Sequence, residues 1–315
     1  MSSETTDATP IGVGIVGLGK IAHDQHIPAI QANPAFKLVA YASPTSAHTS
    51  LEGFKDMGAM LAAHPDIQAV SLCTPPTVRF ALARQALEAG RAVLLEKPPG
   101  ATLGEVDALR DLAAARKQTI FAAWHAREAP AVDPAKAWLA GRQLKSARII
   151  WKEDVRHWHP GQEWVWSPGA LGVFDPGINA LSILTKLLDE RVIVRGAELF
   201  VPANRQTPIA ANLDLATETG VPIRAEFDWR QTGAQTWNVE LETDRGRAVL
   251  SLGGAKLEVD GKVLAEAPDA EYPGLYRVFA GLVRAGRSEL DAEPLRVVAD
   301  AFLLGARTAV EAFSF

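Results

Sequence analysis

Residues 11–26, IGVGIVGLGKIAHDQH, combine an apolar run with a glycine pattern that indicates the fold of the N-terminal half. Its apolar run at residues 13–16 predicts a buried strand, and the loop that follows contains Gly17 and Gly19. The spacing Gly17-x-Gly19-x-x-Ala22 matches the fingerprint of a dinucleotide-binding turn. In such a turn the first glycine permits a sharp bend, the second lets the backbone approach a pyrophosphate, and the small third residue lets helix and strand pack closely.

The same glycine spacing also occurs starting at Gly12, but that register places its first glycines inside the apolar strand. The register that starts at Gly17 follows the strand and opens a helix, whose N-terminal amides and positive dipole favour a phosphate. We therefore expect Gly17, Gly19, Lys20 and Ile21 to contact a dinucleotide.

The composition is typical of a globular protein with two domains. The chain has 315 residues, of which 48% are apolar and 22% charged, and a net charge of −5. The length exceeds what one small core needs, and the weak negative charge argues against nucleic acid or an anionic membrane as a partner. We expect a polar tail at residues 1–10, a dinucleotide-binding domain at 11–128, and a substrate-binding and oligomerisation domain at 129–315.

Three further features favour a cytoplasmic protein. Residues 1–10 are polar and acidic, unlike a signal peptide. No apolar run reaches the length of a membrane span. Cys73, the single cysteine, cannot form an intrachain disulfide, and its apolar surroundings predict a small buried side chain rather than a nucleophile.

Strand and helix patterns alternate through the first half of the chain. After the first strand we expect strands at residues 36–42, 69–73, 91–95 and 119–123, and helices at residues 77–89 and 103–117. This alternation predicts a doubly wound parallel sheet of the Rossmann type, which binds ligands at the carboxyl ends of its strands. The strand ends beyond the glycine loop carry Ser43, Thr45, Thr74, Pro75, Glu96, Lys97, Trp124 and His125.

The segment RAVLLEKPPG, residues 91–100, places an acid, a lysine and two prolines directly after a buried strand. A Glu-Lys pair at a strand end is more often the start of a solvated loop, but the glycine loop upstream favours catalysis. Pro98 and Pro99 stiffen the backbone around Lys97, and a Lys-Pro bond accommodates a cis peptide. We expect this bond to be cis and Lys97 to act in the reaction.

The pattern changes after residue 129. Apolar and polar residues then alternate in segments that predict strands at 146–155, 192–201, 211–216, 223–229, 237–243 and 248–252. Helices are expected at 133–140, 171–188, 272–285 and 294–313. These segments predict a C-terminal α/β domain with an open, mostly antiparallel sheet that helices cover on one face.

Residues 151–179, WKEDVRHWHPGQEWVWSPGALGVFDPGIN, hold four of the eight tryptophans together with several acids and histidines. Tryptophans can stack on the apolar face of a sugar while polar groups bind its hydroxyls. For any one tryptophan, packing against a sheet face remains the alternative. The acids and histidines lack a tight ligand spacing such as His-Glu-x-x-His, so no metal is expected.

Asp175 and Asn179 lie four residues apart and would project from one face of a helix. Because Pro176 follows Asp175, the acid could instead cap a helix that starts at this proline. A start near residues 167–169 would leave Asp175 in the first turns of the helix, with its side chain in a cleft.

With the glycine loop, the Glu-Lys-Pro segment and Asp-x-x-x-Asn in this order, the chain resembles the Gfo/Idh/MocA oxidoreductases over nearly its whole length. Members of that family join a Rossmann domain to an α/β domain whose open sheet often serves in oligomerisation. They oxidise or reduce sugars and cyclitols with NAD or NADP. The stretches WKEDVRHWHPGQEW and GVFDPGINALSI most resemble its aldose 1-dehydrogenase branch, which converts L-arabinose and D-galactose to lactones.

The resemblance implies that Lys97 and Asp175 are catalytic and that the chain forms a dimer through its C-terminal sheet. The family's helix motif usually has a histidine where this chain has Asn179, and an asparagine cannot act as a base at neutral pH. Proton removal therefore falls to Lys97 or Asp175. The expected sugar-binding residues are Glu96, His125, Glu153, His159, Trp166 and Asn179.

The residues at the end of the second strand indicate which dinucleotide the chain prefers. NAD enzymes usually have an acid there to bind the ribose 2′-hydroxyl. This chain has Ser43 and Thr45 instead, with neither a carboxylate nor an arginine, so we expect NADP to be preferred and NAD still used. Two other functions fit the same motifs: a dehydrogenase of cyclitols or other sugars, and a non-enzymatic dinucleotide sensor, against which the polar cleft argues.

Overall fold

The computed structural model describes residues 9–45, 47–48 and 50–315, so most of the expected polar tail lies outside the described residues. The chain divides into two compact units. Unit 1 comprises Met1–Ala123 and Tyr272–Asp291, and unit 2 comprises Trp124–Glu271 and Ala292–Phe315. Each unit is built around its own sheet.

Unit 1 contains a parallel sheet with the strand order β3-β2-β1-β4-β5-β6. This is the doubly wound arrangement, with its crossover next to β1, and it confirms the predicted Rossmann fold. The strands are β1 (Ile11–Val16), β2 (Phe36–Ala42), β3 (Glu52–Phe54), β4 (Ala69–Leu72), β5 (Ala92–Glu96) and β6 (Ile120–Ala123).

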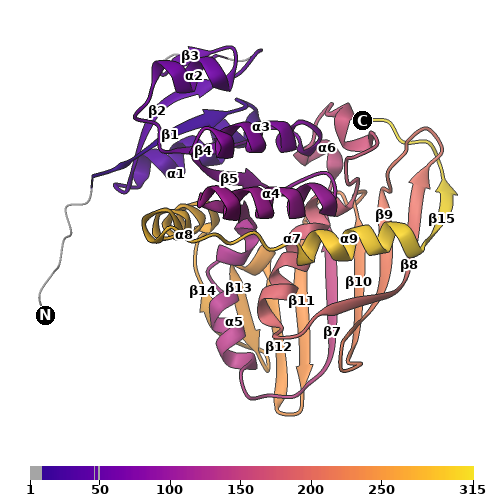
Figure 1. The fold of residues 1–315 in the computed structure, drawn as a ribbon. Helices are drawn as coiled ribbons and strands as arrows, with labels where there is room; N and C mark the ends of the chain where they lie inside the picture. Colours follow the sequence, from indigo (N-terminus) through magenta and orange to yellow (C-terminus); the bar gives the residue numbers. More distant parts are fainter. Residues whose placement is uncertain (1–8, 46, 49) are drawn as a thin grey trace, which may run out of the picture. The chain divides into compact units, whose positions relative to one another are not determined.

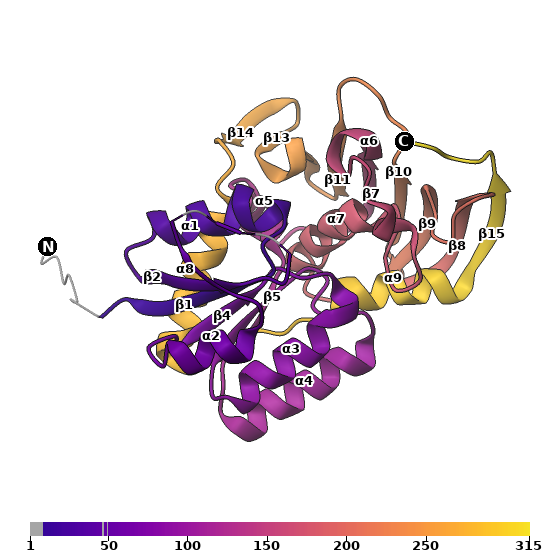
Figure 2. The same ribbon diagram turned by 90° about the horizontal axis from the view of Figure 1, so that it is seen from above.

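Helices cover both faces of this sheet, with α1 and α8 on one face and α3 and α4 on the other (Figure 2). They are η1 (Ala22–His26, a π-helical turn), α1 (Ile27–Ala32), α2 (Met57–Ala63), α3 (Pro76–Glu88), α4 (Leu103–Arg116) and α8 (Glu271–Ala285). The sequence assigned the segment of α8 to the second domain. It belongs to unit 1 because Tyr276 and Phe279 pack their rings against Phe36, with centroids 5.5 and 6.0 Å away.

Unit 2 contains a mixed sheet with the order β14-β13-β12-β11-β7-β10-β9-β8-β15. Its β10–β7 and β15–β8 pairs are parallel and the remaining pairs antiparallel, which confirms an open, mostly antiparallel sheet. The strands are β7 (Leu144–Lys152), β8 (Val192–Pro202), β9 (Ala210–Thr217), β10 (Pro222–Asp228), β11 (Thr236–Thr243), β12 (Gly246–Ser251), β13 (Lys256–Val259), β14 (Lys262–Glu266) and β15 (Gly305–Val310).

Three helices of unit 2, α5, α7 and α9, lie along one face of this sheet (Figure 1). The helical segments of the unit are η2 (His125–Glu128), α5 (Val132–Leu139), α6 (Val155–Trp158), η3 (Glu163–Trp166), α7 (Phe174–Leu187), η4 (Leu252–Gly254) and α9 (Glu293–Leu304). Within the described residues of either unit, we find no helix with the length and apolar character to cross a membrane.

The prediction of a helix at residues 294–313 was wrong for the residues after Leu304. The helix ends at Leu304, and β15 follows directly as an edge strand parallel to β8. Gly305 sits at the change of direction, where a Cβ atom would lie 2.5 Å from the Ala301 carbonyl oxygen. Pairing with a strand about a hundred residues away, rather than local preference, thus decides the structure of residues 305–310.

Candidate active site

The glycine loop of unit 1 has the geometry of a phosphate-binding turn. Gly17 has a φ of +88°, and a Cβ atom there would lie 2.8 Å from Thr74 Cγ2. A Cβ atom at Gly19 would meet nothing within 4 Å, so the space beside this backbone is open to a ligand. Gly12 and Gly14 lie inside β1 as predicted, and a Cβ atom at Gly12 would come within 2.3 Å of the Asp66 carbonyl oxygen.

The other strand ends of unit 1 also fit a dinucleotide. Ser43 follows β2 and is buried, and its backbone N–H donates to the Phe54 carbonyl at 2.9 Å. Thr45, two residues further on, is exposed. Thr74 follows β4, and its buried Oγ1 has no hydrogen-bond partner in the described part of the chain. A buried hydroxyl without a partner beside Gly17 of the glycine loop fits a polar ligand such as NAD or NADP.

A turn after β5 carries Lys97, and its backbone is held by Arg79 of α3. Arg79 is only 2% exposed, and its Nη1 donates to the Glu96 carbonyl at 2.6 Å and to the Pro98 carbonyl. Its Nη2 donates to the Thr74 carbonyl, so one guanidinium joins two neighbouring strand ends. The Lys97–Pro98 peptide bond is cis, which confirms that prediction.

Glu96 holds the same turn through its side chain. Its Oε2 accepts the Lys97 backbone N–H at 2.8 Å, and its Oε1 accepts the Tyr272 hydroxyl at 2.7 Å. The same Oε1 lies 3.0 Å from His26 Nε2. With 4% of its surface exposed, this carboxylate fastens the turn to η1 and α8. Direct sugar or cofactor binding by Glu96 stays a prediction.

His26 is fully buried between Glu96 and Tyr276, whose hydroxyl lies 2.7 Å from His26 Nδ1. Burial alone lowers the pKa of this imidazole, but the acidic groups around it, Cys73, Tyr276 and Glu96, together raise that pKa well above its ordinary value. A protonated His26 donates from both ring nitrogens, and the Tyr276 hydroxyl then donates to Ser71 Oγ at 2.8 Å. Every member of this chain of hydrogen bonds has a partner.

In unit 2, two indoles hold Glu153 just beyond the end of β7. Its Oε1 accepts from Trp229 Nε1 at 3.2 Å, and its Oε2 accepts from Trp237 Nε1 at 2.9 Å. Burial raises the pKa of this carboxyl, whereas the two indole hydrogen bonds lower it, and the balance is a raised pKa. Both oxygens accept, as an ionised carboxylate requires.

The neighbouring residues of the cluster are His159, Asp175 and Trp166. His159 Nε2 lies 3.3 Å from Asp175 Oδ2, and the His159 ring is 5.3 Å from the Trp229 ring. Trp166 contacts Trp229 edge to face at 5.4 Å, and its buried Nε1 has no hydrogen-bond partner among the described residues. Asp175 lies in the first turn of α7 and Val173 occupies the cap position, so Asp175 does not cap this helix.

The structure thus brings four predicted residues of unit 2 together: Glu153, His159, Trp166 and Asp175. Asn179 lies one turn beyond Asp175 on α7 and is half-buried. His125 instead pairs through Nδ1 with Glu271, so its predicted role in sugar binding stays a prediction.

Sequence reasoning missed several residues that shape these sites. Trp229, just after β10, and Trp237 of β11 both donate to Glu153, and neither has a local signal that links it to the segment 151–179. Arg79 offered a weak signal, because it is a charged residue in the first turns of a helix that follows a strand end. Within the described residues, no group of three or more His, Cys, Asp and Glu side chains is arranged to hold a metal ion.

Comparison with known proteins decides the family. Residues 11–123 match the model described as the oxidoreductase family with an NAD-binding Rossmann fold, Gfo/Idh/MocA. A galactose 1-dehydrogenase of Pseudomonas fluorescens is 48% identical over 306 residues, which cover 96% of this chain and 99% of that protein. The chain belongs to the Gfo/Idh/MocA oxidoreductase family. The predicted resemblance is confirmed, and this chain is an oxidoreductase.

Two solved structures are similar to this chain. The crystal structure of a D-galactose-1-dehydrogenase protein from Rhizobium etli superimposes with a TM-score of 0.94 at 54% identity, covering 98% of this chain and 99% of that one. A 3-ketoreductase from Actinomadura kijaniata, solved with NADP and TDP-benzene, has a TM-score of 0.84 at 20% identity over 96% of this chain and 99% of that one. The second likeness shows the shared fold alone.

Proposed function

We propose that this Gfo/Idh/MocA oxidoreductase oxidises an aldopyranose at C1 to the lactone, with D-galactose and L-arabinose as substrates. The observation that carries the proposal is the similarity, over almost the whole chain, to two galactose 1-dehydrogenases at 48% and 54% identity. NADP is the proposed hydride acceptor, with NAD as a second one.

The polar and aromatic cluster of unit 2 supports a sugar as the substrate. Glu153 and His159 offer groups that bind hydroxyls, and the ring of Trp166 beside them is apolar. The Nε1 of Trp166 is a buried donor that lacks a partner in the described chain and fits a sugar oxygen. Asn179 adds a donor and an acceptor on one side chain, so it can bind a hydroxyl either way.

The residues at the strand ends of unit 1 would hold the dinucleotide. Its phosphates would meet the loop of Gly17, Gly19, Lys20 and Ile21, and the ribose 2′-phosphate would lie near Ser43 and Thr45. The expected contacts nearer the nicotinamide are Thr74, Pro75, Glu96, Lys97 and Trp124. When bound, the nicotinamide supplies an acceptor for the hydride that leaves C1.

The chain itself must remove the proton of the anomeric hydroxyl, so that C1 and its oxygen form the lactone carbonyl as the C1–H bond breaks. The neutral amine of Lys97 or the carboxylate of Asp175 would take this proton. Glu96 would act as a positioning residue, because its carboxylate holds the Lys97 backbone N–H.

A panel of five substrates tests the proposal by the appearance of reduced nicotinamide. D-Galactose and L-arabinose share the axial C4 hydroxyl, whereas D-glucose and D-xylose carry it equatorially, and myo-inositol represents the cyclitols. An epimer leaves a buried polar group unpaired at a cost of about 1–3 kcal/mol, so kcat/KM should fall roughly ten- to a hundredfold for the equatorial pair.

The panel separates three outcomes. Equal rates for the C4 epimers would remove the proposed role of Asn179, and Asn179→Ala should abolish the discrimination if the role is real. Turnover of myo-inositol alone would assign the protein to cyclitols. No activity on any aldose would refute the proposed function.

A further inference from the structure

Residues 310–313 are hydrogen-bonded to Ala203 and Asn204 of unit 2. The Ala203 backbone N–H donates to the Val310 carbonyl at 3.0 Å, where β15 ends. The Asn204 side chain then donates to the Phe313 carbonyl at 2.9 Å and accepts the Phe313 backbone N–H at 2.9 Å. Both backbone groups of Phe313 are thus bound to one side chain, and this double hydrogen bond gives Phe313 a defined position.

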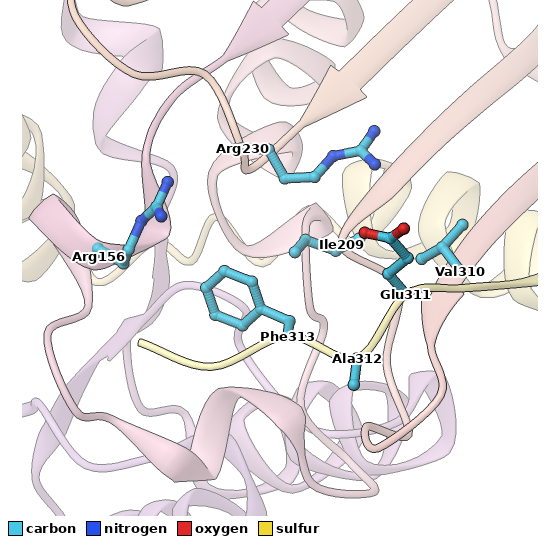
Figure 3. A pocket seen from close by; sticks show the side chains of 7 residues that line it. All are labelled: Arg156, Ile209, Arg230, Val310, Glu311, Ala312 and Phe313. Carbon is cyan, nitrogen blue, oxygen red and sulfur yellow. The ribbon is translucent and has the colours of Figure 1, made fainter.

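The ring of Phe313 contacts two residues of the segment that carries His159. Its centroid lies 5.4 Å from the Trp166 ring and 5.9 Å from the Arg156 guanidinium carbon. Figure 3 shows the ring projecting from the tail on the side of Arg156. The ring also lines a cavity of about 390 Å³. That cavity is lined by Arg156, Ile209, Arg230, Val310, Glu311, Ala312 and Phe313.

Trp166 connects Phe313 to the polar cluster of Glu153, His159 and Asp175. It packs against Trp229, which donates to Glu153 and lies 5.3 Å from the His159 ring. On the other side of His159, Arg156 occupies α6 and is paired with Asp154 at 2.9 Å. Phe313 therefore touches the segment 155–166 both before and after His159.

We infer that Phe313 is a positioning residue that holds the segment 155–166, and with it His159 and Trp166, in the arrangement that binds the sugar. The inference rests on the proposed function. An aromatic contact and a cation–π contact act on the same ring, and each is strong enough to change the population of an ordered loop. Removing the ring leaves the chemistry of Lys97 and Asp175 in place, so the effect falls on sugar binding.

The test compares Phe313→Ala with Phe315→Ala in the full-length protein. Phe315 is an exposed phenylalanine two residues later, and its ring lies 5.7 Å from the ring of Phe313. Phe313→Ala should raise KM for D-galactose roughly five- to tenfold while kcat and KM for NADP change less than about twofold. Phe315→Ala should leave all three values near those of the wild type, and Phe313→Tyr should restore most of the lost affinity.

A double-mutant cycle and an activity-independent measurement sharpen the test. Because the ring of Phe313 contacts Trp166, Phe313→Ala should raise KM less in a Trp166→Ala background than in the wild type, and the effect that remains is assigned to the contact with Arg156. In hydrogen exchange, Phe313→Ala should speed the exchange of amides in residues 155–166, and Phe315→Ala should not.

Two results would overturn the inference. One is an unchanged KM for D-galactose in an active Phe313→Ala enzyme, and the other is unchanged exchange in residues 155–166. A wild type that oxidises no aldose would refute the proposed function instead, and the exchange measurement would still decide whether Phe313 orders this segment.

Discussion

Lys97 is the residue on which the proposed chemistry depends most. Arg79 and Glu96 hold the backbone of its turn, which leaves the amine on a rigid support. Lys97→Ala should lower kcat by on the order of 10²–10⁴, because that is the usual contribution of a general base, and should change the Kd for NADP only slightly. Steady-state kinetics and a cofactor titration measure the two effects.

Two matched variants decide between the candidate bases. Lys97→Arg keeps the positive charge but cannot accept a proton, so it should stay as slow as Lys97→Ala if Lys97 is the base. Asp175→Asn keeps the shape of the side chain and removes its basicity. Near-normal turnover in both Lys97 variants, with a large loss in Asp175→Asn, would assign the proton to Asp175.

Ser43 offers a prediction about the cofactor. It is buried at the end of β2, where its backbone is fixed by the Phe54 carbonyl, so an acid placed there would face the ribose 2′ position. Ser43→Asp should lower the ratio of kcat/KM for NADP to that for NAD on the order of tenfold to a hundredfold through charge repulsion. Ser43→Asn, similar in size and uncharged, serves as the control. An unchanged ratio in Ser43→Asp would mean that the 2′ group is recognised elsewhere.

The buried pair of His26 and Glu96, together with the Tyr272 hydroxyl, joins η1, β5 and α8. The folded-state pKa of His26 is raised above its ordinary value of 6.5, so its protonation stabilises the folded protein below that value. This stabilisation is lost as the pH rises through the folded-state pKa. The melting temperature should therefore decline over that window in the wild type.

His26→Gln should flatten this decline while lowering the melting temperature at acidic pH. His23→Gln, an exposed histidine one turn earlier, is the control and should keep the wild-type pH profile. Thermal unfolding followed across the neutral range measures both. A wild-type slope retained in His26→Gln would show that other groups set the pH dependence.

Most elements of unit 1 could be predicted closely because local pattern and burial agree there, whereas β3 and α2 were not predicted. The strand expected at residues 36–42 is β2 itself, and the helix at 103–117 differs from α4 by one residue.

In unit 2, the hairpin of β13 and β14 was missed although Asp260-Gly261 is a strong turn signal, with φ values of 48° and 79°. By contrast, β15 depends on pairing with β8, and no local pattern predicts it.

Some residues of the candidate site could be predicted from local sequence, whereas others depend on the pairing of distant strands. Lys97 and the glycine loop follow strands directly, so their positions come from local sequence and from the topology of a parallel sheet. Glu153, His159 and Asp175 could be proposed because they share one segment. The tryptophan partners of Glu153 are Trp229, which directly follows β10, and Trp237 of β11, and they reach Glu153 only because both strands pair with β7 in the mixed sheet.

The face of the unit 2 sheet that α5, α7 and α9 leave uncovered is the proposed dimer contact. Arg148 of β7 and Glu226 of β10 pair across this face at 2.6 Å, and Lys152 joins Glu226 at 3.1 Å. Because these charges neutralise one another, covering them costs less than covering isolated charges. Ile150 lies between Arg148 and Lys152 along β7 and is only half-buried, so it would gain burial in a dimer.

Ile150→Asp should therefore convert a dimer into a monomer in sedimentation experiments, because a buried carboxylate without a partner is costly. Val78→Asp changes an equally apolar residue that is 50% exposed on α3 of unit 1, and it should leave the dimer intact. A wild type that sediments as a monomer at every concentration would refute the dimer. A dimer that survives Ile150→Asp would place the contact on another surface, and the sheet face would then be covered by solvent alone.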